Sequence, residues 1–535
     1  MSHARLLSVE VSRFKSYNNA TRLDLKPLTV LVGRNNSGKS TMVQALLLLK
    51  QTLESPRTEV PLSLVGTVEA LSLRELTYGW PKSINTTEPG PTFTITIESQ
   101  LDLARAASNT IKTSEKVLID NGIIGLKNLT SRPAALVKTT VGIRFREKGR
   151  HAVLDYVDVH SHESDIYRSD FRILISLRHD GSAGIWAGGD HSPGLGVEWD
   201  HFIPHLTLDR AGLGPRDLDR IRHNLWLFRC QQPLDDLRAL LRGFGFLGST
   251  RALPPTLYPV SASEPPDNVG VSGEYAAELL HARRDDVVHY LPPISIANNV
   301  PSVDEIVRAR PLSEAVNDIF SAIGLDGHIS IEDVKDVGFR LLYGRATLQH
   351  VGRGLTYLLP LIEYGLLLDP KRFDASTGDV SREEFINSLT SYSLAALEEP
   401  EAHIHPKLQT QLAHWFVALA MCGRNLIVET HSDHLVRRLR GLIARAPKGS
   451  PLEIWLRDNV SIVEVSRDGE GRSSLVSSAL TPSGEFERWP ADFMDVATDE
   501  EREIYDAALD KSDPTSLPPE MDGIVHDEGD EPEEP

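Results

Sequence analysis

The sequence predicts an α/β fold whose central sheet is mostly parallel, and three stretches carry that prediction. An apolar run at 28–32 leads into Gly-Arg-Asn-Asn-Ser-Gly-Lys-Ser-Thr at 33–41, which is followed by a helix-forming segment. Later in the chain, apolar runs alternate with segments of helical periodicity, at 394–397, 407–421, 426–428 and 432–446. Short buried strands that alternate with helices after a glycine-rich loop are typical of a parallel sheet.

Outside those stretches the chain reads as a β-rich region followed by helical segments. Two short strands are predicted at 5–12 and 21–25, and a helix at 41–52. Segments of period two, separated by glycine and charged turns, indicate a largely antiparallel β lobe and lie at 92–98, 139–146, 151–160 and 171–178. Helical periodicity marks a helical insertion and later helices, at 206–242, 273–288, 312–323 and 355–368, and a polar connection follows at 371–384.

The loop at 33–41 has the spacing G-x-x-x-x-G-K-[ST] of a nucleotide phosphate-binding loop, between a strand and a helix as that motif requires. Backbone N–H groups of such a loop point at the phosphates, so the predicted binding residues are Gly33, Arg34, Asn35, Asn36, Ser37, Gly38, Lys39, Ser40 and Thr41. Lys39 supplies a point charge for the β- and γ-phosphates, and the Ser40 hydroxyl is placed to ligate Mg²⁺. A glycine-rich turn that binds nothing is the alternative, and the readable strand and helix disfavour it. The motif predicts ATP or GTP as the ligand.

Carboxylates at the end of a second strand complete this prediction. The apolar run at 394–397 ends in Glu398 and Glu399, of which the first is predicted to hold Mg²⁺ through water and the second to polarise the attacking water. An ordinary strand that ends in exposed acids is the alternative. After the next apolar run, His431 stands where a histidine can sense a γ-phosphate and orient that water.

These motifs, in this order, resemble the ABC-type ATPases of the RecF/SMC/OLD-like group, which are AAA-family proteins of prokaryotes. The early segment Arg13-Phe14-Lys15-Ser16-Tyr17 also looks like that group's F-K-S-F segment near the nucleotide base. The resemblance implies an ABC-type P-loop ATPase head, ATP as the nucleotide, Glu398 on Mg²⁺, Glu399 as catalytic base and His431 as the switch histidine. Many ABC ATPases have Asp at the first acid, so Glu398 adds a methylene there.

The same resemblance implies a signature motif that reaches the γ-phosphate of an opposite protomer. The candidate is Gly352, Arg353 and Gly354, just before an apolar helix, where two glycines at a helix N-terminus can cradle an anion. Similar proteins have an acidic residue and a serine where this chain has His350 and Thr356. We expect Arg353 to add charge in trans, and we expect a homodimer with ATP sandwiched between its heads.

Two further segments, 246–252 with 268–270 and 484–493, resemble a subfamily of bacterial ATPases in which a small domain of unknown function follows the ATPase core. The likeness covers 1–55, 244–280 and 345–495. The predicted organisation is two halves of the head at 1–80 and 331–480, a β-rich lobe at 81–200, a helical insertion at 201–330, a small extension at 481–510 and a disordered acidic tail at 511–535.

Composition fits a soluble globular protein, with 40% hydrophobic and 24% charged residues over 535 positions. The net charge of −19 is uneven, because 16 acidic residues against Arg502 and Lys511 give residues 495–535 a balance of −14 and leave −5 for the rest. No apolar run approaches the roughly 18 residues that span a bilayer, and no signal peptide is readable. Two isolated cysteines, Cys230 and Cys422, suit a reducing cytoplasm and are expected to be buried.

Several functions remain open at this level. The first is an ATPase switch that controls a separate effector protein or acts on DNA or RNA, in DNA repair or phage defence. Arginines of 206–242 could face nucleic acid, although a solvated helix face is the favoured interpretation: Arg210, Arg216, Arg220, Arg222, Arg229, Arg238 and Arg242. The alternatives are an OLD-type nuclease, for which Asp458 and Asp468 are poor metal ligands, and an ATP-bound scaffold with negligible turnover. His403 and His405 are expected to serve dimer contact rather than metal binding.

Overall fold

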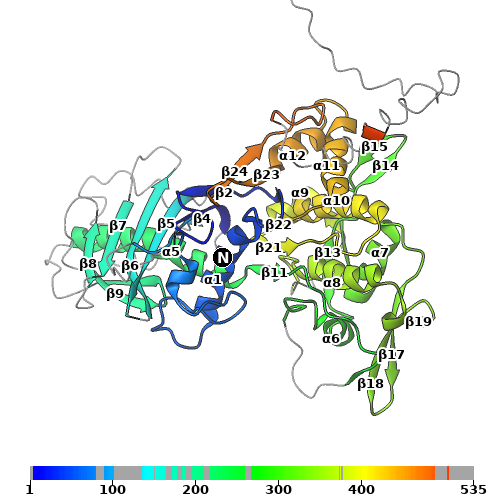
Figure 1. Ribbon diagram of the computed structural model, residues 1–535, viewed down its shortest axis with the longest axis horizontal. Coiled ribbons are helices and arrows are strands. Elements are labelled where there is room, and N and C mark those ends of the chain that lie inside the picture. The colour runs from blue at the N-terminus through cyan, green and yellow to red at the C-terminus, as the bar shows by residue number, and fades with distance from the viewer. Residues whose placement is uncertain are drawn as a thin grey trace, which may run out of the picture. The chain divides into compact units, whose positions relative to one another are not determined.

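A computed structural model describes residues 4–79, 89–101, 135–149, 151–163, 171–177, 183–187, 195–208, 217–259, 267–372, 374, 378–488 and 503–504 (Figure 1). The chain divides into two compact units, Met1–Pro490 and Ala491–Pro535, and the elements below belong to the first. The predicted acidic tail at 511–535 and most of the extension at 481–510 lie outside the described residues. Within the described part, no helix is long and apolar enough to cross a membrane.

The head is built on a six-stranded sheet in the order β11-β21-β22-β3-β23-β24. All neighbours are parallel except β23 and β24, so the prediction of a mostly parallel sheet is confirmed. The central strand β3 is buried at every position because it has neighbours on both edges and helices nearby. The strands are β11 (Gly245–Leu247), β21 (Ser393–Glu398), β22 (Arg424–Glu429), β3 (Leu28–Val32), β23 (Val460–Arg467) and β24 (Ser473–Ser478).

Helices pack around this sheet at the predicted places. Helix α1 (Lys39–Glu54) contacts both β22 of the head sheet and β1 of the second sheet, so it lies between the two sheets. Helix α10 (Pro406–Met421) buries Leu412 to Met421 against β22 and β3, and α11 (Asp433–Arg445) packs on α10 (Figure 1). The Ser432 side chain caps α11 by accepting from the Leu435 N–H. Helix α12 (Pro451–Asn459) then contacts α11 and β23.

A seven-stranded antiparallel sheet forms the β lobe, in the order β2-β1-β4-β5-β6-β7-β8. The predicted lobe is confirmed, and it also takes in the two N-terminal strands that precede the phosphate loop. Edge-to-face aromatic contacts run through its core from Phe14 to Phe93, Phe145 and Phe202. The strands are β1 (Ala4–Ser12), β2 (Thr21–Asp24), β4 (Thr92–Leu101), β5 (Ala135–Lys148), β6 (His151–Glu163), β7 (Phe171–Leu177) and β8 (Ala183–Ala187).

The region predicted as a helical insertion mixes helices and strands. Residues 203–208 form β10 (Ile203–Leu208), paired with β9 (Leu195–Asp200), and helix α5 begins only at Asp217 and ends at Arg242. The helix predicted over 273–288 is also wrong in extent, because α6 (Ala276–Ala282) stops and 287–290 form a strand. That strand, β13 (Val287–Tyr290), is β-branched and aromatic and pairs with β16 (Ile306–Pro311). Strand β11 from this region joins the head sheet beside β21.

The rest of the head surrounds two central helices. Both segments are helices, as predicted, and α7 (Leu312–Ala322) packs on α8 (Arg353–Leu367). The predicted polar connection at 371–384 contains β20 (Val380–Ser381) and the start of α9 (Arg382–Asn387). Small antiparallel strands complete this region: β12 (Tyr258–Pro259), β14 (Ser295–Ala297), β15 (Val300–Ser302), β17 (Ile329–Val334), β18 (Gly338–Tyr343) and β19 (Ala346–Thr347). Two short 3₁₀ helices lie at Leu73–Leu76, beside β5, and at Leu348–His350, beside β18.

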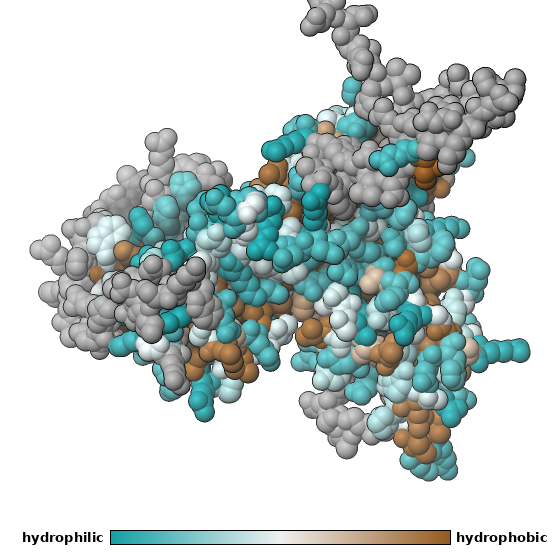
Figure 2. Space-filling view, in the orientation of Figure 1, coloured by the Kyte–Doolittle hydropathy of each residue, from teal (hydrophilic) through white to brown (hydrophobic). Residues whose placement is uncertain are grey.

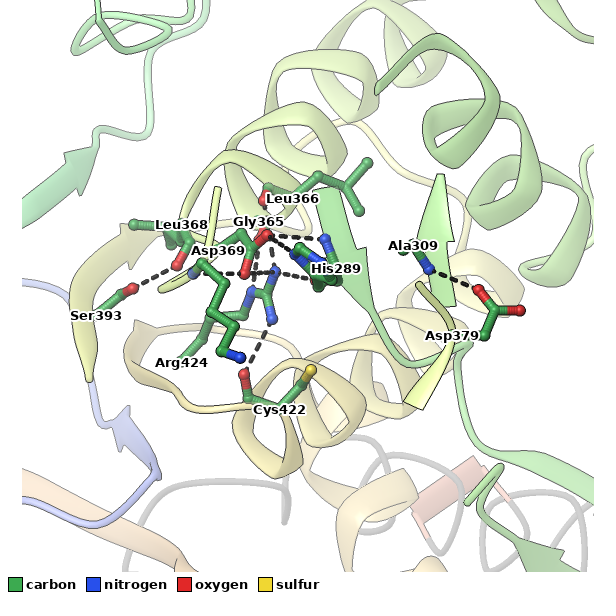
Figure 3. Close-up of polar contacts among 11 residues, drawn as sticks. His289, Ala309, Gly365, Leu366, Leu368, Asp369, Asp379, Ser393, Cys422 and Arg424 are labelled. Carbon is green, nitrogen blue, oxygen red and sulfur yellow. Dashed lines mark hydrogen bonds and ion pairs between the residues drawn. The ribbon is translucent and has the colours of Figure 1, made fainter. Parts of the chain in front are cut away.

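A fully buried polar network ties the end of α8 to the start of β22 (Figure 3). His289 donates from Nδ1 to the Asp369 carboxylate at 2.8 Å, and Arg424 lies 3.7 Å from that carboxylate. Arg424 also donates to the main-chain oxygens of Gly365, Cys422 and His289. Burial alone would raise the pKa of Asp369, but the His289 hydrogen bond and the Arg424 charge hold that pKa below its ordinary value. The predicted burial of both cysteines is confirmed.

Candidate nucleotide-binding site

The loop at 33–38 connects β3 to α1 at the carboxyl edge of the head sheet, where parallel α/β sheets bind ligands. Gly33 has φ 143° and Gly38 has φ 109°, both outside the range that other residues adopt readily. A Cβ on Gly33 would stand 2.2 Å from the Val465 main-chain oxygen, and one on Gly38 would stand 2.5 Å from Ser473 Oγ. Both glycines are therefore required by β23 and β24 behind the loop, in addition to any crowding of a ligand.

The two side chains predicted to face phosphate and metal lie at the start of α1. Lys39 is 3% exposed and its ammonium donates to the main-chain oxygens of Gly33 and Arg34, each at 2.9 Å. Burial lowers the pKa of Lys39, and the charges of three nearby glutamates oppose that shift. Ser40 Oγ donates to Glu429 Oε1 at 2.8 Å. An acid that the sequence interpretation did not single out is thus the direct partner of the predicted metal ligand.

The turn at 13–17 lies against this loop and the first turns of α1. Arg13 and Lys15 have φ values of 55° and 49°, which bend the chain back between β1 and β2. The Tyr17 hydroxyl donates to the Gly38 main-chain oxygen at 3.1 Å, and Lys15 Nζ donates to Gln44 Oε1 at 2.6 Å. This turn therefore helps to hold the loop in shape from its N-terminal side.

The predicted acids lie at the end of β21, which β22 separates from β3 in the sheet. Glu398 pairs in register with Glu429 on β22, and the Glu399 N–H donates to the Glu429 main-chain oxygen at 2.8 Å. Burial, followed by the charges of the neighbouring glutamates, raises the pKa of Glu398 to about 7. Glu399 has φ 42° and its side chain is 43% exposed, so its carboxylate faces solvent at the strand end.

His431 lies next to these acids. Its Nε2 is 4.0 Å from Glu399 Oε1, and its main-chain N–H donates to Glu401 Oε1 at 2.7 Å. Burial and the Lys39 charge lower the pKa of His431, so the imidazole is neutral near pH 7. The structure thus brings together Glu399 and His431, which the sequence interpretation assigned to hydrolysis, and the charge of Lys39, which it assigned to phosphate binding, acts on His431.

Three residues of this edge were missed by the sequence interpretation. Glu429 and Glu401 are 6% and 8% exposed, and each lies within two residues of a predicted site residue. Arg251, after β11, is 4% exposed and donates from Nη2 to the Glu398 main-chain oxygen at 3.3 Å. Burial lowers the pKa of Arg251 to about 10. The available signal was a charged residue at or near the end of a short apolar strand: Glu429 ends β22, Glu401 lies three residues after β21, and Arg251 lies four residues after β11.

The predicted signature residues lie at the start of α8. Gly352 and Arg353 are exposed, and a Cβ on Gly352 would meet nothing within 4 Å. A Cβ on Gly354 would instead stand 2.7 Å from the His403 main-chain oxygen. Among the described residues, the hydrogen bonds of 352–354 do not include a partner in the loop at 33–41. These glycines therefore present an accessible helix N-terminus, beside the segment that follows Glu399.

His403 and His405 have structural partners. The His403 ring meets the edge of Tyr357 with centroids 4.8 Å apart, and His405 Nδ1 accepts the Lys407 N–H at the start of α10. Within the described part of the chain, no group of three or more His, Cys, Asp or Glu side chains is arranged to hold a metal ion. The arginines predicted as a basic face also have internal partners where they are described, since Arg238 and Arg242 pair with Asp200.

The residues present fit a polyphosphate with a divalent cation. Helix α1 begins at the loop without a side-chain cap, and the free N–H groups of a helix N-terminus bind anions. Among the described residues, buried oxygens at this edge that have no hydrogen-bond partner are Ser16 Oγ, Ser37 Oγ, Glu401 Oε2 and Glu429 Oε2. Hydroxyl and carboxylate oxygens are the donors that Mg²⁺ prefers, and it binds them together with phosphate oxygens.

Two family comparisons match the segments that build this edge. Residues 5–128 match a family described as "AAA ATPase domain", and residues 343–437 match one described as "AAA domain, putative AbiEii toxin, Type IV TA system". The first segment contains the phosphate loop, and the second contains Gly352, Glu399 and His431. Fold, site and matches together define a P-loop ATPase. More particularly, both matched segments are similar to AAA ATPase domains, and each carries one half of the candidate site.

No protein with a curated function matches the chain. Among solved structures, an SMC head bound to the C-winged helix domain of ScpA is 11% identical, with 89% of this chain and 98% of that one covered and a TM-score of 0.37. An SMC head with an extended coiled coil, bound to the C-terminal domain of ScpA from Pyrococcus furiosus, is 12% identical, with 94% of this chain and 100% of that one covered and a TM-score of 0.35. The SMC head of Thermotoga maritima is 12% identical, with 88% of this chain and 98% of that one covered and a TM-score of 0.33. TM-scores this low carry no weight for function.

Proposed function

We propose that this chain is an ATP-hydrolysing switch that dimerises through its ATPase heads. The observation that carries the proposal is the convergence of Lys39, Ser40 and strand-end carboxylates on one phosphate loop. Gly352 and Arg353 form an exposed helix N-terminus with no described hydrogen bond to that loop. A second copy can supply this helix end to the γ-phosphate, so that ATP joins two heads.

Each residue at the edge has a proposed task. Lys39 places its charge on the β- and γ-phosphates, and Ser40 and Glu398 hold Mg²⁺, which supplies Lewis-acid stabilisation of phosphate oxygens when bound. Glu399 is exposed and 4.0 Å from His431, so it can accept a proton from a water molecule that the imidazole orients. Hydrolysis then removes the γ-phosphate that held the two heads together.

The lifetime of the ATP-bound dimer is the proposed output of the switch. It would set how long a separate effector protein, or a bound DNA or RNA, stays engaged, in DNA repair or phage defence in the cytoplasm. The description of the second matched family, which names a toxin of a toxin–antitoxin system, supports a role in defence. A test must first detect whether ATP makes the heads dimerise.

The test is the solution mass of Glu399→Gln with and without ATP and Mg²⁺, compared with Lys39→Ala. Glu399→Gln should form a dimer, or a tighter assembly, only with ATP, because binding is retained while hydrolysis is blocked. The mass of Lys39→Ala should not change when ATP is added, because this variant lacks the charge that binds the phosphates. Double-stranded DNA that raises wild-type turnover would identify nucleic acid as the trigger. No change in mass or shape with ATP would refute the switch and leave a scaffold with negligible turnover.

An OLD-type nuclease is the alternative within this fold class. Cleavage of plasmid DNA by the purified chain with Mg²⁺ or Mn²⁺, abolished by a chelator and retained in Glu399→Gln, would establish that activity instead.

A further inference from the structure

The closest side-chain partner of Ser40 is an acid on the strand between the phosphate loop and the predicted metal acid. Glu429 ends β22, which lies between β3 and β21 in the head sheet. Its Oε1 accepts the Ser40 hydroxyl proton at 2.8 Å, whereas Glu398 lies one strand farther from β3. Register places Glu429 beside Leu31, two residues before the loop begins.

The chemistry of a serine hydroxyl makes this contact directional. The group has one proton and two lone pairs, and only a lone pair can bind a cation. Because the proton of Ser40 is given to Glu429, its lone pairs are turned away from that carboxylate. An acceptor that takes the proton of a metal ligand orients the ligand and raises its basicity, and loss of such a partner lowers metal affinity about 10- to 100-fold.

The surroundings of Glu429 show that it is not a solvated surface acid. It is 6% exposed, and its second oxygen, Oε2, has no hydrogen-bond partner among the described residues. Its charge acts on Lys39 and on Glu398, as does that of Glu399. The edge therefore gathers three mostly buried carboxyl groups, Glu398, Glu401 and Glu429, against Lys39 and Arg251, an arrangement that a bound cation would stabilise.

We propose that Glu429 is a positioning residue for the divalent cation, acting through Ser40 by holding the hydroxyl with its lone pairs toward the cation. The proposal rests on the nucleotide site described under the proposed function. It adds a second carboxylate to that site and ranks it ahead of Glu398 in control over Ser40. Glu429 itself touches neither nucleotide nor water in this role.

The test separates nucleotide binding with the cation from nucleotide binding without it. Affinity for a fluorescent, non-hydrolysable ATP analogue is measured in excess chelator and across a Mg²⁺ titration, for wild type, Glu429→Gln, Glu429→Ala, Ser40→Ala and the Ser40→Ala/Glu429→Ala double variant. Glu429→Gln keeps an oxygen acceptor for the Ser40 proton and removes the charge. It should therefore lose less of the Mg²⁺-dependent gain in nucleotide affinity than Glu429→Ala.

The expected result is a 10- to 100-fold loss of the Mg²⁺-dependent gain in affinity for Glu429→Ala, with affinity in chelator changed less than threefold. The double variant should lose no more than Ser40→Ala alone, because Glu429 acts through Ser40. Glu429→Gln should also melt at a higher temperature than wild type without nucleotide, since it removes one of several like charges. A residue that only supports the fold would shift the melting temperature the other way.

A matched control is Glu464→Gln. Glu464 is also buried, at 7% exposed, and lies on the other neighbour of β3, but it pairs with Val32 and so faces the opposite side of the sheet from Glu429. This variant should keep the Mg²⁺-dependent gain. Wild-type affinity for Mg²⁺-ATP in both Glu429 variants, or fully additive losses in the double variant, would overturn the inference. A wild-type chain that binds no ATP would instead overturn the proposed function itself.

Discussion

Gly354, at the second position of α8, lies directly against the main-chain oxygen of His403, which a Cβ there would approach to 2.7 Å. The His403 ring also meets Tyr357 one helical turn farther along α8. These two contacts fix the exposed start of α8 to the segment that follows Glu399. A displacement of either segment is therefore expected to move the other, which connects the helix end that we propose faces a partner with the acid of its own site.

Replacing Gly354 with alanine should force α8 and the segment at 403 apart, because backbone atoms cannot yield as a flexible side chain would. We expect a loss of about 1–3 kcal/mol in the free energy of unfolding and reduced ATP-dependent dimerisation. Gly352→Ala is the control, since its Cβ meets nothing within 4 Å, and it should change stability by less than about 1 kcal/mol. Urea unfolding compares the two, and equal stabilities would contradict the importance of the His403 contact.

Glu399→Gln should lower the rate of ATP hydrolysis by about 10²- to 10⁴-fold, the usual contribution of a general base. The 43% exposed side chain makes few contacts, so folding and ATP affinity should be retained. His431→Ala should lower the rate as well, with a smaller effect because the imidazole only orients the water. Phosphate release measures the rates, and the exposed Glu383→Gln on α9 serves as control. Turnover of Glu399→Gln at the wild-type rate would remove Glu399 from the mechanism.

Arg424→Met should destabilise the chain by about 3–5 kcal/mol, as expected when one partner of a buried ion pair is removed. Asp369 would lose its cation in a site with no access to water, and three main-chain oxygens would lose their donor. The exposed Arg340→Met, which breaks a surface pair with Glu332, should change stability by less than about 0.5 kcal/mol. Denaturant unfolding of the two variants measures the contrast, and similar losses would show that the network in Figure 3 contributes little.

Stability should fall as the pH falls through the range of His414. Its Nδ1 donates to the Ile294 main-chain oxygen at 2.6 Å, and burial, with Arg438 and Arg445 nearby, lowers its pKa to about 4. In the unfolded chain this histidine is protonated below about pH 6.5, whereas in the folded chain it stays neutral down to about pH 4. Its contribution to the free energy of unfolding is therefore fully present above about pH 6.5 and is lost as the pH falls toward about 4. The loss from this group amounts to about 3 kcal/mol at the lower end.

The wild type and His414→Gln, which keeps a donor for Ile294 but does not titrate, are compared by thermal melting from pH 8 to pH 4. The melting temperature of wild type should fall more steeply than that of the variant as the pH is lowered, so that the variant gains relative to wild type at low pH. Parallel curves would show that His414 is not the titrating group.

The sequence was sufficient to locate the contiguous motifs of the candidate site at the ends of strands. The phosphate loop, the paired acids after β21 and His431 each sit at the end of a short apolar run, where local pattern and position agree. The antiparallel lobe was readable for the same reason, since alternation of buried and exposed residues is a local signal.

What the sequence could not show depends on contacts between distant residues. Glu429 reads as the last residue of a buried strand, and only its 2.8 Å contact with Ser40, 389 positions away, gives it a role. The helix expected over 273–288 failed because pairing of Val288 with Arg310 outweighs the local helical pattern. Apart from Cys422, the partners of Arg424 are likewise distant in sequence, on α8, on β13 and at Asp369, so the local sequence does not explain a buried arginine.

Strand β3 is made early in synthesis, but both of its neighbours, β22 and β23, are made near the end. Leu31 pairs with Glu429, so at about 5–20 residues per second the strand waits roughly 20–80 s for its first partner. Throughout that time a strand that the finished fold buries at every position lacks both of its neighbours on the growing chain, which makes it a natural target for chaperones. A chain that terminates before β22 lacks both the central neighbour of β3 and Glu429, so nucleotide binding by nascent protein would report that synthesis has passed β22.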